Sequence, residues 1–385
     1  MIPTALLGWV VSIALADSPA ADAPPPPPPP TENPDVAALA ARIAALEAAL
    51  RDREMADLLR EADAAAPVTT ASAPSLFPMN PGITAFGDLV GQLGLDPEGV
   101  RPGSTMYLRS MELDISATVD PFAKATAVIA FEQEAPPLDG SAAAGDFGAG
   151  PEEAYVDLVA LPWHLSARVG KFKQPFGLVN RTHPHDLPWV DAPAAIGLLA
   201  EDGYNDTGGT LSWVLPVGPL AVTTTAGALA GDPFEEDGPE AALAGLGRVE
   251  VFGGFGDVDV GVGGSAVKHF GGDDPALGAD FSFRYRPSQR ASVVVLGEVL
   301  QSPDGELGGY AALQVQPARS VYLGLREDIL ADGMKHNFFL SYYTSEFLRL
   351  RIGGGYAPAD EAGEALAQLT FVWGSHPTEP WWVNR

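Results

Sequence analysis

The 385-residue chain contains no cysteine and has few basic residues. Without cysteine it forms neither a disulfide framework nor a cysteine zinc site. Lysine and arginine together number 22 against 50 aspartates and glutamates, which gives a formal net charge of −28. Nucleic acid is therefore excluded as a partner, because its phosphates would repel so acidic a chain.

Long apolar runs are also missing beyond the N-terminus. No later stretch approaches the roughly 18 consecutive apolar residues that a membrane-spanning helix needs. Hydrophobic residues still make up 46% of the chain, too many for a protein that is disordered throughout. Low charge, 43 glycines and no long apolar run are typical of a β-rich chain, and a membrane barrel is one such chain.

Residues 1–16 have the pattern of a secretory signal peptide. Residues 6–15 form its apolar core, and residues 14–16 (Ala-Leu-Ala) fit a small-x-small cleavage site. No lysine or arginine precedes the core, so the amino terminus alone supplies positive charge. A short membrane anchor is the alternative, but a Pro-rich segment follows at once, and we predict export.

A linker and a short helix are predicted between the signal and the rest of the chain. Residues 17–34 are Pro-rich, and seven consecutive prolines at 24–30 favour a stiff polyproline II spacer over a recognition ligand. Residues 35–64 are predicted to form a helix in the periplasm, followed by a second linker at 65–81. Its apolar residues are spaced 3, 4, 3, 4, which indicates either a short coiled coil or a lone amphipathic helix: Val36, Leu39, Ile43, Leu46 and Leu50.

From residue 82 the hydrophobic pattern has a period of two. In LGADFSFRYR at 277–286, one face is apolar and the other is Gly, Asp, Ser, Arg and Arg. The same alternation occurs at 111–119, 257–265 and 347–354. One apolar and one polar face at this period is the signature of a transmembrane β-barrel strand.

We count about sixteen such strands within residues 82–385. They are expected to begin near residues 83, 104, 122, 152, 164, 207, 218, 247, 257, 276, 290, 307, 319, 334, 346 and 364. Short connections alternate with longer, acidic ones, as in outer-membrane barrels with short periplasmic turns and long outer loops. A soluble β-sandwich would show similar strands but explains neither the export signal nor the loop alternation. The predicted fold is therefore an all-β transmembrane antiparallel barrel in the bacterial outer membrane, in contact with its lipid.

The connection at 174–206 is the most informative segment. Loops of this length are uncommon unless they are functional. This one carries apolar and aromatic residues that an exposed loop does not need: Phe176, Leu187, Trp189, Val190, Ile196, Leu198 and Leu199. We predict that it folds into the barrel and narrows the pore, because a sixteen-strand barrel is wide without a constriction.

Polar residues in and just before this loop are the predicted pore or constriction residues: Lys171, Lys173, Arg181, His183, His185, Asp186 and Asp191. The two lysines and the arginine are the candidates for solute contact. The two histidines with the two aspartates resemble a weak metal motif, since imidazole and carboxylate suit zinc. Hydrogen bonding of the loop to the wall is the favoured explanation, so no metal and no other cofactor is predicted, and His183 and His185 stay the weaker alternative.

Further charged residues on the polar strand faces are expected to line the lumen: Arg168, Arg284, Arg349, Arg351, Glu112 and Asp114. Facing basic and acidic walls create a transverse field that orients dipolar solutes. Alternatively, these side chains pair with one another and brace the wall.

Three segments resemble the phosphate-selective porin O/P group and related porin-like proteins. These are RVGKFKQPFG at 168–177, NRTHPHDLPWVDAP at 180–193 and EDGYNDTGGTLSW at 201–213; the first and last strands, FPMNPGITAFGDLVGQL at 77–93 and LTFVWGSHP at 369–377, are also similar. The resemblance implies a sixteen-stranded, homotrimeric channel with an infolded third loop. The chain departs from the group by continuing as TEPWWVNR, and its mixed lumenal charge does not imply phosphate selectivity.

The predicted function is a porin for small hydrophilic solutes or ions, without chemistry. The alternative is a structural or binding protein with a closed pore, which tethers the envelope or captures divalent cations at its acidic loops. No enzyme is predicted, because GxSxG, zincin and phosphate-loop motifs are absent. A TonB-dependent transporter would need a plug and about 22 strands.

Overall fold

The computed structural model of the chain describes residues 81–142, 145–200, 203–231, 243–271, 274–374 and 380–384. The chain divides into two compact units, Met1–Leu76 and Phe77–Arg385, and all described residues belong to the second. The signal peptide, linkers and helix predicted for residues 1–80 lie outside the described residues.

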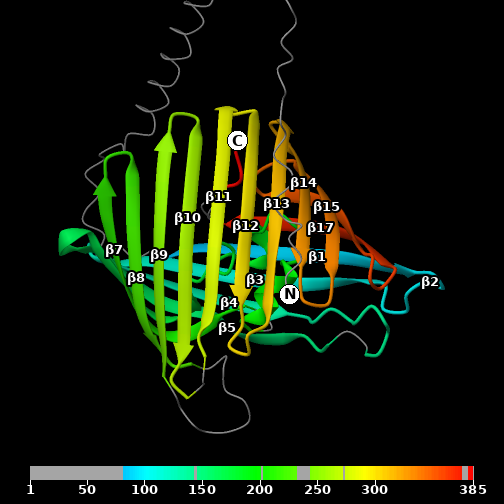
Figure 1. Ribbon diagram of the computed structural model, residues 1–385, viewed down its shortest axis with the longest axis horizontal. Coiled ribbons are helices and arrows are strands. Elements are labelled where there is room, and N and C mark those ends of the chain that lie inside the picture. The colour runs from blue at the N-terminus through cyan, green and yellow to red at the C-terminus, as the bar shows by residue number, and fades with distance from the viewer. Residues whose placement is uncertain are drawn as a thin grey trace, which may run out of the picture. The chain divides into compact units, whose positions relative to one another are not determined.

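Within the described residues, sixteen long antiparallel strands and one two-residue strand form a single closed sheet (Figure 1). Their bounds are β1 Gly82–Asp96, β2 Gly99–Val100, β3 Thr105–Asp120, β4 Ala123–Glu132, β5 Gly148–Leu161, β6 Leu165–Lys173, β7 Asn205–Val217, β8 Leu220–Leu229, β9 Ala244–Phe255, β10 Val258–His269, β11 Ala276–Ser288, β12 Ala291–Gln301, β13 Leu307–Ala318, β14 Val321–Ile329, β15 Met334–Tyr343, β16 Leu348–Ala357 and β17 Ala362–Gly374. Each long strand pairs with the next, and β17 pairs with β1 to close the barrel. The predicted all-β barrel is confirmed.

The sixteen predicted strand starts lie within four residues of the observed ones, and the largest difference is at β5, which begins at Gly148. The sequence reading missed β2, which folds back on the end of β1 inside the first long connection. Two residues are too few for a periodic pattern, so alternation carries no signal there.

The strand faces divide as the alternation predicts. On β11, Leu277 and Phe281 are 43% and 41% exposed on the outer face. Their neighbours Asp280 and Ser282 point inward and are buried. Apolar side chains outside and polar side chains inside suit a barrel whose wall contacts lipid.

Short turns join β3 to β4, β5 to β6 and every later odd-to-even pair at one end of the barrel. The longer connections lie at the other end, and β1 begins and β17 ends on the side of the short turns. The described helices are three 3₁₀ turns, η1 Pro162–His164, η2 Pro184–Asp186 and η3 Ala194–Leu198. No helix among the described residues has the length and apolarity to cross a membrane.

The connection between β6 and β7 folds into the barrel, as predicted. Its apolar side chains form one buried cluster with inward residues of the wall. The loop contributes Phe176, Val179, Leu187, Trp189, Val190, Ala195, Ile196, Leu199 and Tyr204. The wall contributes residues of β1, β8 to β13 and β15, including Leu229, Val294, Leu300, Tyr310 and Phe339. A hydrophobic core inside the lumen therefore holds the loop in place.

Candidate functional site

The two ends of the infolded loop are tied together by Asn180, which is buried. Its side-chain amide donates to the carbonyls of Gln174 and Tyr204, at 2.8 and 2.9 Å. Its Oδ1 accepts the Tyr204 N–H at 2.7 Å. A fully bonded buried amide fixes the loop neck, because an unsatisfied one would be costly.

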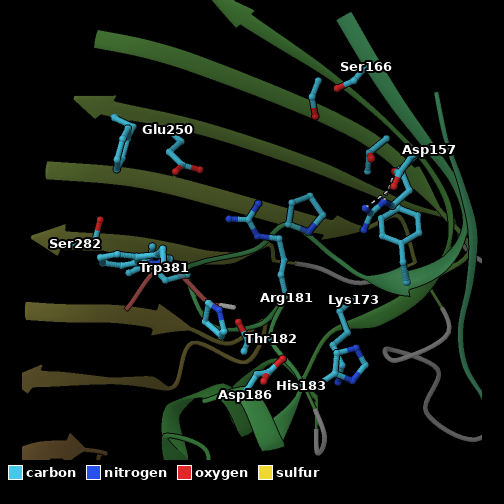
Figure 2. Close-up of a pocket in the computed structure, with 18 of the residues that line it drawn as sticks. Asp157, Ser166, Lys173, Arg181, Thr182, His183, Asp186, Glu250, Ser282 and Trp381 are labelled. Carbon is cyan, nitrogen blue, oxygen red and sulfur yellow. Dashed lines mark hydrogen bonds and ion pairs between the residues drawn. The ribbon is translucent and has the colours of Figure 1, made fainter. Parts of the chain in front are cut away.

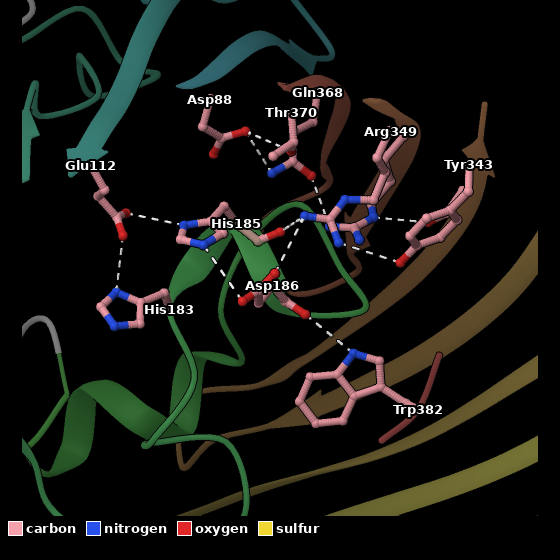
Figure 3. Close-up of polar contacts among 12 residues, drawn as sticks. Asp88, Glu112, His183, His185, Asp186, Tyr343, Arg349, Gln368, Thr370 and Trp382 are labelled. Atoms are coloured by element: carbon pink, nitrogen blue, oxygen red, sulfur yellow. Dashed lines mark hydrogen bonds and ion pairs between the residues drawn. The ribbon is translucent and has the colours of Figure 1, made fainter. Parts of the chain in front are cut away.

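Four arginines on the wall hold carbonyl oxygens of the loop. Arg109 donates to Val190 O and Arg351 donates to Trp189 O, each at 2.5 Å. Arg326 donates to Asp191 O at 2.9 Å, and Arg349 donates to the carbonyl of His185 (Figure 3). Backbone carbonyls are bonded here by charged donors, which make stronger hydrogen bonds than neutral ones.

Arg349 and Arg351, two of the predicted lumen residues, lie on the inner face of the wall, where the loop covers them. They are only 8% and 1% exposed. Arg351 also donates to Ser341 Oγ and Gln368 Oε1, both at 2.8 Å, and Arg349 to the Tyr343 hydroxyl at 3.3 Å. The structure thus gives these two arginines a bracing position, which was the alternative weighed for them.

Asp191, predicted in the constriction, anchors the loop by its side chain. Its Oδ2 accepts from Arg326 at 2.9 Å and from Lys335 at 3.4 Å. Burial opposes its charged form, but Arg326 and Lys335 hold the pKa of the Asp191 carboxyl below its usual value. Asp328 accepts from the same guanidinium at 2.8 Å. A mixed-charge network therefore fixes this part of the loop.

His183 and His185 point to β3 rather than to Asp191. Their Nδ1 atoms lie 3.2 and 3.1 Å from the two carboxylate oxygens of Glu112 (Figure 3). His185 is buried and stacks on Phe86. Asp186 lies 3.5 Å from His185 Nε2. The predicted histidine pair is thus brought together, with a glutamate that the motif did not include.

Two further carboxylates complete the surroundings of His183. Glu152 Oε2 lies 3.3 Å from its Nδ1, and Glu153 Oε2 lies 3.3 Å from its Nε2. Burial alone would disfavour the charged ring, but Glu112, Glu152 and Glu153 raise the pKa of His183 well above its ordinary value. For His185 burial is again opposed, by Glu112 and Asp186, and its pKa is raised. This corner of the lumen attracts positive charge.

The C-terminal residues 380–384 also lie inside the barrel, on the side of the short turns (Figure 1). Trp382 is buried, and its Nε1 donates to Asp186 O at 3.2 Å. Gln314 donates to Trp382 O at 2.9 Å, and Tyr322 donates to Asn384 O at 2.9 Å. The last barrel strand, β17, ends at Gly374. Residues 380–384 are instead a segment docked in the lumen.

An open cavity of about 740 Å³ remains between the loop, this C-terminal segment and the wall (Figure 2). The wall side is formed by β5, β6, β7, β9 and β11, through residues such as Asp157, Arg168, Thr210, Glu250 and Arg284. The loop contributes Leu178, Arg181, Thr182, His183 and Asp186, and the C-terminal segment contributes Trp381 and Trp382. The unfilled part of the lumen therefore has both charged and aromatic walls.

Most charged groups at this cavity are paired within the protein. Arg168 bonds Asp157 at 2.7 and 2.9 Å, and Arg284 bonds Asp259 at 2.7 and 2.9 Å. Lys173, one of the predicted pore residues, lines the cavity and lies 2.9 Å from Glu152. These pairs partly cancel the field that the lumenal charges were expected to create.

Arg181 differs from these residues. In the part of the chain that the structure describes, it has no hydrogen bond or ion pair, and it is exposed. Figure 2 shows its guanidinium directed into the cavity, with Glu250 on the facing wall. A guanidinium that faces a cavity with its N–H donors free is suited to bind anionic or polar solutes.

Two predicted residues lie elsewhere. Lys171 does not line the cavity, and its amine lies 3.4 Å from Pro151 O. Asp114 is half-buried on β3, next in the inward row after Glu112. Two features that matter here were missed from sequence: the Glu152–Glu153 pair and the docking of Trp382. The sequence shows that the chain continues as TEPWWVNR after the last strand, but its residues do not indicate where this extension binds.

The barrel is similar to solved porins. OmpF of Salmonella typhi in complex with daunomycin matches with a TM-score of 0.51 and 10% identity, over 76% of this chain and 97% of that one. An anion-selective porin from Comamonas acidovorans matches with a TM-score of 0.50 and 12% identity, over 77% and 100%. The chain has the fold of porin β-barrels.

No family model matches the chain. A stretch of 110 residues is 31% identical to an uncharacterized protein of Aquifex aeolicus, strain VF5. That stretch is 29% of this chain and 21% of the other, so the chain spans about a fifth of that relative. The resemblance to the phosphate-selective porin group therefore stays a prediction.

Proposed function

We propose that the chain is an outer-membrane porin through which small hydrophilic solutes or ions diffuse passively. The observation that carries the proposal is the cavity between the loop and the β5–β11 wall, because it is an unfilled, charged space inside the barrel beside the packed core of the loop. Solutes would pass along this side, between the paired charges of the wall and the unpaired Arg181. The porin fold, the inward polar faces and the outward apolar faces support it.

In this proposal the loop forms the narrowest part of the solute path. Its backbone is bonded to the wall through Arg109, Arg326, Arg349 and Arg351, so it acts as a fixed constriction. The selectivity would be weak, with a preference for anions at Arg181. The solved porin from Comamonas acidovorans carries the description anion-selective, which agrees with this direction. Assembly as a homotrimer, as the porin O/P resemblance implies, is part of the proposal.

The experiment is the reversal potential of the purified barrel in a planar bilayer under a KCl gradient. Wild type should give discrete current steps and a reversal potential of anion-preferring sign. The variant Arg181→Gln should shift that potential toward cations. The matched control is Lys171→Gln, which removes one positive charge of the same neighbourhood but outside the cavity. An equal shift in both variants would reject Arg181 as the selective contact.

A closed-pore binding protein is the second candidate, and the docked C-terminal segment favours it. Residues 380–384 occupy the lumen beneath the loop, where Trp382 touches Asp186. If the full chain carries no current and a chain ending at Gly374 does, this segment closes the pore. If neither conducts although both barrels are folded, the porin proposal fails.

A further inference from the structure

Three ligand atoms of the right type converge at the edge of the cavity. His183 Nδ1 lies 3.2 Å from Glu112 Oε2 and 3.3 Å from Glu152 Oε2. All three atoms lie within 4.8 Å of one another. In a tetrahedral zinc site, bonds of about 2.0–2.2 Å place ligand atoms roughly 3.3–3.5 Å apart. Small side-chain movements would therefore bring all three atoms onto one ion.

The other polar atoms of these ligands are already held. His183 Nε2 lies 3.3 Å from Glu153, Glu112 Oε1 lies 3.1 Å from His185, and Glu152 Oε1 lies 2.9 Å from Lys173. A metal-bound histidine usually donates its second ring N–H to a carboxylate, which fixes the tautomer and aims the free nitrogen at the metal. Here that partner, Glu153, is in place before any ion binds.

Two of the converging atoms have no hydrogen bond of good geometry. Glu152 Oε2 and His183 Nδ1 are buried, and within the described structure they have ion-pair contacts with each other, and His183 Nδ1 with Glu112, but no hydrogen bond. Three carboxylates face one lysine, so the cluster carries −3 + 1 = −2 once an incoming metal ion has displaced the Nδ1 proton of His183 to solvent. A divalent cation would satisfy both the unbonded atoms and the excess charge.

We propose that Glu112, Glu152 and His183 bind one divalent transition-metal ion of the zinc class at the edge of the pore. One imidazole and two carboxylates suit Zn²⁺ better than Ca²⁺, which takes six to eight oxygens. His183 also lines the cavity, so a fourth coordination position is open to water or to an anionic solute. This ligand set differs from the sequence motif, because Glu112 and Glu152 replace His185 and the aspartates.

The test is equilibrium binding of Zn²⁺ to the folded, EDTA-treated protein in detergent, by calorimetry, with Co²⁺ absorption as a second probe. Wild type should bind one tight ion per chain and give the visible Co²⁺ band of a low-coordinate site. His183→Gln and Glu152→Gln should each abolish that band and weaken zinc binding by at least about 100-fold, and Glu153→Gln by about 10–100-fold.

The matched control is His336→Gln. His336 pairs with Glu327 on the barrel and is 48% exposed by side chain, so it offers an imidazole and a carboxylate without a third ligand. This variant should bind zinc as wild type does.

The site is rejected if wild type binds no stoichiometric ion, or if His183→Gln and Glu152→Gln bind as tightly as His336→Gln. Far-ultraviolet circular dichroism and the heat-modifiable gel shift check that each barrel is folded. If His183→Gln does not fold, binding of zinc by Glu152→Gln decides.

Discussion

Replacing Trp382 with alanine should release the C-terminal segment from the lumen. The indole is 3% exposed and packs in the lumenal core, and its Nε1 donates to Asp186 O at 3.2 Å. Truncating a buried tryptophan to alanine costs about 3–5 kcal/mol. The ratio of docked to undocked segment should therefore fall by roughly 100- to 4,000-fold, at about 1.4 kcal/mol for each tenfold change.

The absence of native cysteine makes this release measurable. A single cysteine at Val383→Cys, beside Trp382, reports the undocked population through its rate of reaction with a bulky maleimide. Val383 packs against the lumenal core, so the docked segment should react slowly. In the Trp382→Ala background the rate should rise by at least about 100-fold, and the single-channel conductance should increase or become noisy.

Trp381→Ala is the comparison variant. Trp381 lines the cavity, 5.2 Å from the Arg284 guanidinium, and is less buried than Trp382. It should raise the labelling rate less than Trp382→Ala does. Equal labelling rates in the Val383→Cys protein with and without Trp382→Ala, in barrels that remain folded, would refute the docking of this segment in the lumen.

Three other perturbations act on the loop. Arg326→Met leaves Asp191 and Asp328 without their guanidinium, so unfolding free energy should fall by about 3–5 kcal/mol and current noise should rise, whereas Arg290→Met in an exposed turn should do neither. The pKa of Asp191 is lower in the folded protein than the usual aspartate value of about 3.9. Its ion pairs therefore contribute their full stability above that usual value and lose it as the pH falls through the folded pKa. Current noise from a loosened loop should thus appear in the acid range and be absent between pH 5 and 7. Gly177→Ala should destabilise the loop by about 1–3 kcal/mol in chemical unfolding, because φ is +63° and the new Cβ would lie 2.0 Å from Glu298 Oε2, whereas Gly218→Ala, at a similar φ in open space, should lack that clash.

The barrel could be predicted because its signal is local. Alternation along LGADFSFRYR fixes which side chains of β11 face inward without knowledge of any other strand. The infolding of the long loop followed in the same way, since residues such as Trp189 and Ile196 need burial wherever the loop goes. Both inferences use only the composition and spacing of one segment.

The details of the site depend on register between distant strands, and no local pattern contains that. His183 meets Glu112 of β3 and Glu152 of β5 only because the loop packs on that wall. From the sequence, Arg349 and Arg351 were expected to line the lumen because they lie on the inward face of their strand, but the loop lies over them. Arg181, in the loop itself, was identified because it is a cation in a segment expected to narrow the pore.

Single-channel current from folded, purified wild-type barrel in a planar bilayer tests the proposed solute path most directly. We predict discrete steps with an anion-preferring reversal potential under a KCl gradient, and loss of that preference in Arg181→Gln. Folded protein that gives no steps, both as the full chain and when ended at Gly374, would contradict the proposal that the cavity beside the loop is a solute path.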